Sequence, residues 1–321
     1  MGPPLSGPLS RRDAGLDERH AARSWAGAEG ALRALTAAAS AAMVGCVVVI
    51  FVALALATLD GRTVGSTILS TTWSPALGSY GLLPLTFGTL VASLLGVLVA
   101  APVGVLAAIW IVELAPPWVS GPARALVDVI ATLPGVMFGL WGRTVVVPFV
   151  RDHLAPANDA GPSAGFGLVT AGIVLGAMIL PTITALACGA LGGVPASLRE
   201  AAVALGGQRW DVIRHAVLPV ARAGLWGAVA IGLARALAES LAVEMVCGSN
   251  PLWPRSLFAP FSTLGAVLVD ETVDATRVDH IAALAGAAVW LCVLVVPVML
   301  VGRRLLRPRE PAESARVERA A

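Results

Sequence analysis

The sequence contains no lysine, and all 22 of its basic residues are arginine. A P-loop ATPase needs a lysine on its nucleotide phosphates, and Schiff-base chemistry needs a lysine amine, so both classes are excluded. Charged residues are also scarce, at 13% of the 321 residues against about 25% in soluble domains. Because 57% of the residues are hydrophobic, the chain is predicted to be an all-α, polytopic membrane protein.

Residues that could support chemistry are few as well. The four cysteines lie in or beside apolar runs and form no C-x-x-C pair, so we interpret them as small hydrophobic residues: Cys46, Cys188, Cys247 and Cys292. The four histidines are scattered in polar segments and are predicted to be solvated. Only Glu239, Glu244 and Cys247 remain for a membrane-embedded enzyme, without a histidine or a metal-ligand spacing beside them. The sequence therefore favours a protein that is not an enzyme and binds no metal or cofactor itself.

Six apolar segments approach or exceed the ~20 residues that cross a bilayer. They cover about residues 37–59, 84–112, 125–150, 167–191, 221–246 and 281–300, and Pro134-Gly135 interrupts the third. Around a predicted transmembrane domain of residues 36–305, residues 1–35 are predicted to form a disordered cytoplasmic tail and residues 306–321 a second cytoplasmic tail.

The arginines predict the orientation, because cytoplasmic loops carry an excess of positive charge. With the N-terminus inside, sixteen arginines fall in inner segments and four in outer ones, and two lie within spans. Both termini and the segment 195–219 are therefore predicted to be cytoplasmic. The long outer loop, 248–280, is either a surface segment that contacts a partner or a solvated connector.

The segment 195–219 is predicted to form a helical hairpin. Ser197 and Glu200 have the spacing of a capping box, and Gly206-Gly207 is expected to end the first helix. Trp210, Ile213 and Val217 form the apolar face of a second helix, which is expected to stop at Leu218-Pro219. Ala201 and Ala202 leave room for close approach by another surface. A charged hairpin between spans is either a docking site for a cytoplasmic partner or an ordinary connector.

Three ionisable residues lie within the predicted fifth span. Arg235 and Glu239 are four residues apart and are expected to share one helix face, and Glu244 follows. Such groups cost about 2.5–3.5 kcal/mol each at mid-membrane, so they are expected to face the bundle interior. They form either a salt bridge that only stabilises packing or an anion path. Arg143, near the outer end of the third span, either snorkels to the interface or makes a second anion contact.

The anion path has a chemical preference. A guanidinium offers a planar fork of donors to a tetrahedral oxyanion. A neighbouring carboxylate repels fully ionised sulfate but can accept the hydroxyl of hydrogenphosphate. An arginine–glutamate pair is therefore compatible with phosphate.

Two motifs carry a family resemblance. Glu200, Ala201, Ala202, Gly206, Leu218 and Pro219 fit the EAA loop of ABC-importer permeases. The run ARALAESLAVEMV resembles G-R-A-x-G-E-T-M-A-V at Arg235, Glu239, Ala242 and Val243, with Ala234 and Ala238 in place of glycines. From about residue 80 to 305 the chain resembles the PstC-type permeases of phosphate-specific (Pst) ABC importers.

The resemblance implies a type I, MetI-like helix bundle in a bacterial inner membrane. It also implies a PstA-like second permease, a PstB-like ATPase dimer that binds ATP and Mg, and an extracytoplasmic phosphate-binding protein, with no nucleic acid. In this family the EAA loop docks into the ATPase, which assigns that role to Ser197, Glu200 and the other hairpin residues. The alternatives are a permease for another oxyanion or small solute, or a membrane component that senses phosphate.

Overall fold

The computed structural model describes residues 70–155 and 165–306, together with scattered helical positions between 32 and 56. The predicted N-terminal and C-terminal tails therefore lie largely outside the described residues, and the predicted first span is described only at scattered positions, which are helical. The chain divides into two units, Met1–Leu56 and Ala57–Ala321, and all helices and strands after residue 70 belong to the second.

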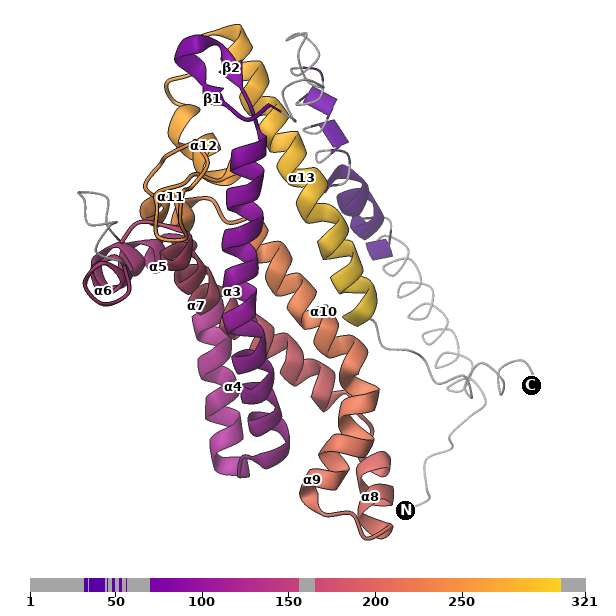
Figure 1. The fold of residues 1–321 in the computed structure, drawn as a ribbon. Helices are drawn as coiled ribbons and strands as arrows, with labels where there is room; N and C mark the ends of the chain where they lie inside the picture. The colour runs from indigo at the N-terminus through magenta and orange to yellow at the C-terminus, as the bar shows by residue number, and fades with distance from the viewer. Residues whose placement is uncertain are drawn as a thin grey trace, which may run out of the picture. The chain divides into compact units, whose positions relative to one another are not determined.

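The described part of the second unit is mostly helical, which confirms the predicted fold class (Figure 1). It begins with a short antiparallel hairpin in which Trp73 pairs with Tyr80. The elements are β1 (Trp73–Ser74), η1 (Pro75–Leu77), β2 (Ser79–Tyr80), α3 (Leu83–Ile109), η2 (Trp110–Leu114), α4 (Pro117–Ala131), α5 (Gly135–Trp141), η3 (Gly142–Val146), α6 (Val147–His153), α7 (Leu168–Gly192), α8 (Ala196–Ala204), α9 (Arg209–Asp211), η5 (Val212–Val217), α10 (Leu218–Leu237), α11 (Leu241–Cys247), α12 (Leu264–Glu271) and α13 (Val278–Leu306).

Among the described residues, four helical segments are long and apolar enough to cross a membrane. They are Leu83–Leu114, Leu168–Gly192, Arg209–Leu237 and Val278–Leu306. The predicted second, fourth and sixth spans are confirmed in this form. α3 runs through Pro102 and α13 through Pro297 without ending, although each proline removes one backbone hydrogen bond.

The predicted third span is not one continuous helix. It is a broken pair, Pro117–Ala131 and Gly135–His153, with a bend of 88° between the two parts. Pro134 has no N–H to donate and disfavours helical backbone at the residue before it, so α4 ends before the proline and α5 begins after it.

The predicted fifth span is wrong at both ends. The helix does not stop at Leu218-Pro219, because α9, η5 and α10 form one continuous helix. The wider π turn of η5 ends at Val217, two residues before Pro219, and the helix continues through this proline although it has no N–H to donate. At the other end α10 closes at Leu237, and a non-helical break, residues 238–240, separates it from α11.

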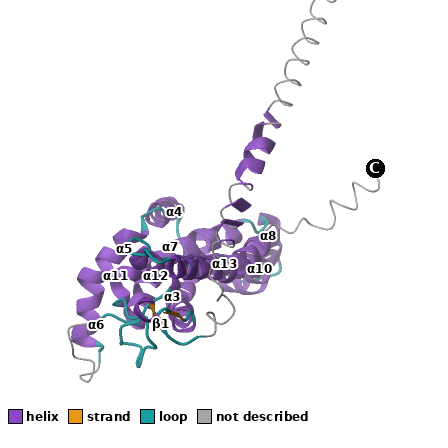
Figure 2. Cartoon of the chain, turned by 90° about the horizontal axis from the view of Figure 1, so that it is seen from above, coloured by secondary structure: helices purple, strands orange, loops and turns teal. Residues whose placement is uncertain are grey.

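Glycines allow the long helices to approach closely. A Cβ at Gly96 of α3 would lie 2.9 Å from Leu175 Cβ of α7, and one at Gly227 of α10 would lie 2.9 Å from the carbonyl oxygen of Gly302 of α13. Small residues at helix contacts are typical of packing in lipid. Seen end-on, α5, α6 and α11 lie on one side of the unit and α10 and α13 on the other (Figure 2).

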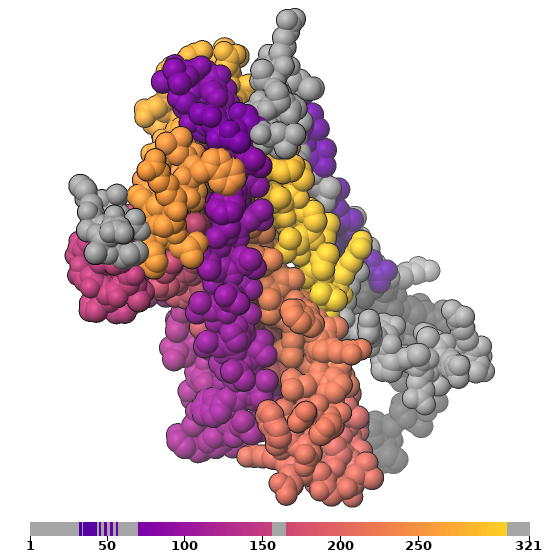
Figure 3. All heavy atoms as spheres, viewed as in Figure 1, coloured from indigo at the N-terminus to yellow at the C-terminus, as the bar shows by residue number. Residues whose placement is uncertain are grey.

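The two ends of the unit differ in character. α8 and α9 form one end, which we call the α8–α9 end, and the hairpin with α12 forms the opposite one, the β1–β2 end (Figure 3). The predicted surface segment after residue 260 is instead part of the core at the β1–β2 end, where Phe261 and Leu264 are buried.

Candidate translocation path and coupling hairpin

The turn between α8 and α9 closes with a Schellman motif. Gly206 has φ +85°, its N–H donates to the carbonyl of Val203 at 2.9 Å, and the N–H of Gly207 donates to that of Ala202 at 3.2 Å. Glycine adopts this left-handed conformation without steric cost, so Gly206 ends α8 as its position in the sequence predicts.

The predicted capping box at Ser197 and Glu200 is wrong. α8 begins earlier, after Pro195, so Ser197 lies inside the helix and makes no capping hydrogen bond. The fixed φ of a proline suits a helix start, and it moves the beginning of α8 two residues ahead of the predicted one. Glu200 and Ala201 are exposed, while Ala202 is half-buried. The second helix is capped by Asp211, whose carboxylate accepts from the N–H of Gln208 at 3.1 Å.

The hairpin buries one apolar face and exposes another. Ile213 and Val217 pack with Leu191 of α7 in a core cluster that extends to the end of α3, as their spacing predicts. Trp210, predicted to share that face, is 56% exposed, and Leu205 at the turn is 90% exposed. Exposed apolar side chains at a polar, arginine-bearing tip are typical of an interaction site.

An ion pair that the sequence did not predict connects α8 to η2 and to the end of α7. Arg199 Nη2 donates to Glu113 Oε1 and to the carbonyl of Leu191, both at 2.8 Å, and Nη1 donates to the carbonyl of Val194 at 2.5 Å. Both side chains are largely buried, with 25% of Arg199 and 10% of Glu113 exposed. The signal in the sequence was an isolated acid at the end of an apolar run.

Arg235 is half-buried at the last turn of α10 and is held by neutral groups. Its Nη1 donates to Thr182 Oγ1 of α7 at 2.8 Å and to the carbonyl of Ala131, at the end of α4, at 3.3 Å. Among the described residues no carboxylate lies within salt-bridge distance of this guanidinium. Its positive charge is therefore anchored but not neutralised.

Glu239 does not share a helix face with Arg235, contrary to the prediction. It lies in the break after α10, where its Oε1 accepts from the N–H of Ala242 at 3.0 Å and so caps α11. A carboxylate at this position satisfies a backbone donor that the new helix leaves free. The self-paired Arg235–Glu239 bridge that the sequence left open is absent from the described part of the chain.

The two helix breaks meet at these side chains. Arg235 reaches the end of α4, and Glu239 lies against the start of α5, since a Cβ at Gly135 would be 2.6 Å from its Oε1. The break in the third span and the break after α10 are therefore adjacent. The guanidinium of Arg235 and the carboxylate of Glu239 both lie there, and each is held by different hydrogen-bond partners. Irregular backbone at membrane depth is tolerated where it is buried in protein or lines a water-filled cavity.

The remaining predicted path residues lie away from this junction. Glu244 is on α11, where Ser249 Oγ donates to its Oε1 at 2.7 Å. Arg143 is exposed on η3 and has no hydrogen-bond or ion-pair partner among the residues that the structure describes. The structure therefore brings Arg235 and Glu239 together at the breaks but not Glu244 or Arg143.

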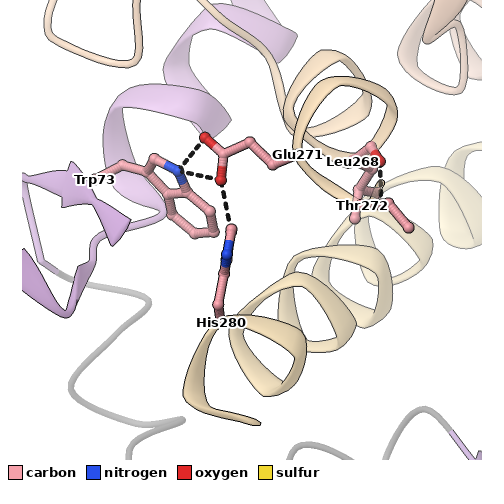
Figure 4. Close-up of polar contacts among 5 residues, drawn as sticks. All are labelled: Trp73, Leu268, Glu271, Thr272 and His280. Atoms are coloured by element: carbon pink, nitrogen blue, oxygen red, sulfur yellow. Dashed lines mark hydrogen bonds and ion pairs between the residues drawn. The ribbon is translucent and has the colours of Figure 1, made fainter. Parts of the chain in front are cut away.

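At the β1–β2 end one carboxylate joins three elements (Figure 4). Glu271 of α12 accepts from Trp73 Nε1 at 2.9 Å and is 2.7 Å from His280 Nε2 of α13. Tyr80 stacks on the His280 ring, with centroids 5.8 Å apart. The prediction that His280 is solvated is wrong, because only 8% of the residue is exposed.

Residues 100–307 match a single family model, described as the binding-protein-dependent transport system inner membrane component. This range includes α7, the α8–α9 hairpin and both helix breaks. The chain belongs to this family. The match covers more than half of the sequence, and the protein is a multi-pass membrane permease, not an enzyme.

The permease is similar to several named relatives. It is 30% identical to the phosphate transport system permease protein PstC of Haemophilus influenzae over 255 residues, covering 75% of this chain and 81% of that one. It is 33% identical to the PstC of Xylella fastidiosa over 250 residues, with 74% and 77% covered. It is 34% identical to the probable ABC transporter permease protein YqgH of Bacillus subtilis, with 72% of each chain covered.

A solved structure supports the fold of the permease. An inward-facing form of the MetNI methionine ABC transporter superposes with a TM-score of 0.51 at 22% identity, covering 70% of this chain and 94% of that one. The predicted MetI-like bundle is confirmed.

Proposed function

We propose that the permease forms part of the path for inorganic phosphate in an ATP-driven importer of a bacterial inner membrane. The observation that carries this proposal is the similarity to relatives named as phosphate transport permeases over three quarters of the chain. The family match contains the hairpin and both breaks, which are the parts that a transport cycle uses.

The junction of the two breaks supplies the chemistry. Arg235 keeps an uncompensated charge and further N–H donors, which suit a tetrahedral oxyanion. The carboxylate of Glu239 is held at the start of α11 by the N–H of Ala242. From there it can accept a hydrogen bond from the hydroxyl of hydrogenphosphate, whereas it repels sulfate. We assign Glu244 and Arg143 to the outer mouth of the path, away from the junction.

The exposed hairpin supplies the coupling. Glu200, Ala201 and Gly206 lie at the accessible tip beside the exposed Leu205 and Trp210, so a cytoplasmic ATPase can grip this surface. Leu218 and Pro219 belong to the continuous helix that runs from the hairpin into α10 and would transmit its movement.

The proposal includes the partners and the orientation. They are a PstA-like permease, a PstB-like ATPase dimer that holds ATP and Mg, and an extracytoplasmic phosphate-binding protein. Both termini and the α8–α9 end are placed in the cytoplasm, since most of the chain's arginines then lie inside.

Reconstitution of the full complex in proteoliposomes tests the proposal. ATP-dependent uptake of labelled phosphate, with little uptake of labelled sulfate, is the expected result. Sulfate uptake at an equal or greater rate would assign the permease to another oxyanion. Phosphate binding without uptake, although the ATPase hydrolyses ATP, would indicate a sensing component.

A Glu239→Gln variant in the same liposomes tests the role of the carboxylate. An amide does not repel sulfate, so the preference for phosphate over sulfate is expected to fall about tenfold, equivalent to ~1.4 kcal/mol. An unchanged preference would leave Glu239 only its capping role on α11.

A further inference from the structure

The ion pair between Arg199 and Glu113 connects elements that are distant in the sequence. Arg199 lies on the first turn of α8. Glu113 lies in η2, the π turn at the end of the span Leu83–Leu114. The residues are 86 positions apart, and their Nη2 and Oε1 atoms are 2.8 Å apart.

The same guanidinium also closes the end of α7. Its donors occupy the carbonyls of Leu191 and Val194, which belong to the last turn of α7 and the linker to α8. Helix C-termini favour positive charge because their last carbonyls have no partner within the helix. One side chain therefore binds α8, the end of α7 and the end of α3 at once.

The surroundings make this connection stiff. Val212, Ile213 and Val217 of the hairpin share one buried cluster with Ile109 and Ile111 at the end of α3. The charged pair lies beside this cluster and is mostly screened from solvent. A planar, bidentate-capable guanidinium fixes geometry more tightly than a point charge does.

We propose that Arg199 is the positioning residue that makes the α8–α9 hairpin and the adjacent end of α3 move as one body. The inference rests on the proposed function, because the movement in question is the one that an ATPase would impose on the hairpin. Without Arg199 the ATPase can still displace the hairpin, but α8 is released from η2 and less of the displacement is passed to α3.

The first test compares transport with hydrolysis in the reconstituted complex. In Arg199→Gln, the phosphate taken up per ATP hydrolysed is expected to fall at least about fivefold while ATP hydrolysis persists, the scale of a typical coupling between sites. Arg151→Gln is the matched control, since Arg151 pairs with Asp152 at 2.8 Å with about half of each side chain exposed. This control should leave the ratio unchanged.

A double variant separates coupling from stability. Arg199→Gln leaves the buried Glu113 carboxylate without its partner, which destabilises the fold, and adding Glu113→Gln removes that charge. Thermal stability is therefore expected to recover in the double variant, whereas the uptake-to-hydrolysis ratio stays low. A ratio that recovers together with stability would reduce Arg199 to a structural role and overturn the inference.

A distance measurement tests the rigid connection directly. Spin labels at Val203 and Leu106, which are 59% and 65% exposed, report on α8 and on α3. They are placed in a background in which the native cysteines are replaced by alanine and phosphate uptake is retained. The distance should stay narrow and constant when nucleotide is trapped in the parent protein, and broaden or shift in Arg199→Gln.

The outcomes distinguish two failures. Absence of phosphate uptake by the parent complex would refute the proposed function. Normal uptake by the parent complex, with the same distance distribution in Arg199→Gln, would refute only the positioning role.

Discussion

Arg235 is a half-buried arginine that has no carboxylate within salt-bridge distance among the described residues. Its guanidinium is held by the Thr182 hydroxyl and the Ala131 carbonyl, which supply acceptors but no negative charge. Hydrogen bonds to a charged group contribute about 1.5–3 kcal/mol each, so these contacts fix the side chain while leaving its field available to an anion.

Arg235→Gln is therefore expected to lower phosphate uptake by about 10- to 150-fold, the equivalent of one charge-assisted hydrogen bond to the anion. Co-purification with the partner chains should be unaffected, because Arg235 lies far from the exposed hairpin. Labelled-phosphate uptake at several concentrations measures the effect, with Arg151→Gln as the exposed arginine control. Full uptake by Arg235→Gln would remove this residue from the path.

Gly206 is required for its left-handed backbone conformation and not for lack of space around it. A Cβ at this position would meet nothing within 4 Å, yet its φ of +85° is one that β-branched residues avoid. Gly206→Val is expected to cost about 1–2 kcal/mol in the turn and to weaken binding of the ATPase to the hairpin.

Co-purification of the ATPase with the permease measures this effect. Gly189→Ala is the matched control, because Gly189 also has open space around it but lies within α7. Equal recovery of the ATPase with Gly206→Val and with this control would argue against the hairpin as the coupling site.

Among the helices, the sequence predicted those features that depend on local composition, which are the long apolar spans and the proline break. Apolar length alone located α3, α7 and α13, and Pro134-Gly135 marked the break between α4 and α5. The break after Leu237 has no such signal, since Ala238, Glu239 and Ser240 include neither proline nor glycine. It depends on a local cap, in which Glu239 accepts from the N–H of Ala242, and on a tertiary contact, the approach of Ser240 to Gly265 of α12.

The cluster around Glu271 was unpredictable for the same reason. Trp73 and Glu271 are 198 positions apart, so no local pattern could show that the outer-loop acid becomes a partly buried acceptor. Its partners come from β1 and α13, and only the packed fold brings them together (Figure 4).

Trp73→Phe is expected to destabilise this cluster. Phenylalanine keeps most of the ring packing but removes the N–H that donates to both Glu271 oxygens, at 2.9 and 3.1 Å. The loss of one donor to this partly buried carboxylate is expected to lower the free energy of unfolding by about 1.5–3 kcal/mol. Thermal unfolding in detergent measures the change. Trp118→Phe, at a residue that is 79% exposed, is the control, and equal stability of the two variants would contradict the assigned hydrogen bond.

For the whole molecule, the arrangement separates two tasks. The junction of helix breaks carries the charged groups, the α8–α9 end carries the exposed apolar tip, and the long helices α3, α7 and α10 connect them. Movement of the hairpin can reach the junction through the continuous helix of α9, η5 and α10, and the Arg199 contact joins the hairpin to η2 at the end of the span Leu83–Leu114. In the proposed cycle the ATPase acts in the cytoplasm. The α8–α9 end must therefore lie on the cytoplasmic side of the bilayer and the β1–β2 end on the outer side.

That topology is itself testable with two exposed positions. Leu205 at the hairpin turn is 90% exposed and Val273 after α12 is 87% exposed, so single cysteines at either site should react readily with a thiol reagent. In intact cells treated with a membrane-impermeant maleimide, Val273→Cys is expected to label and Leu205→Cys is expected to label only after the membrane is opened. Because sixteen arginines lie on the predicted inner side, the reverse pattern would require the chain to violate the positive-inside rule, and it would place the hairpin beyond the reach of any cytoplasmic ATPase.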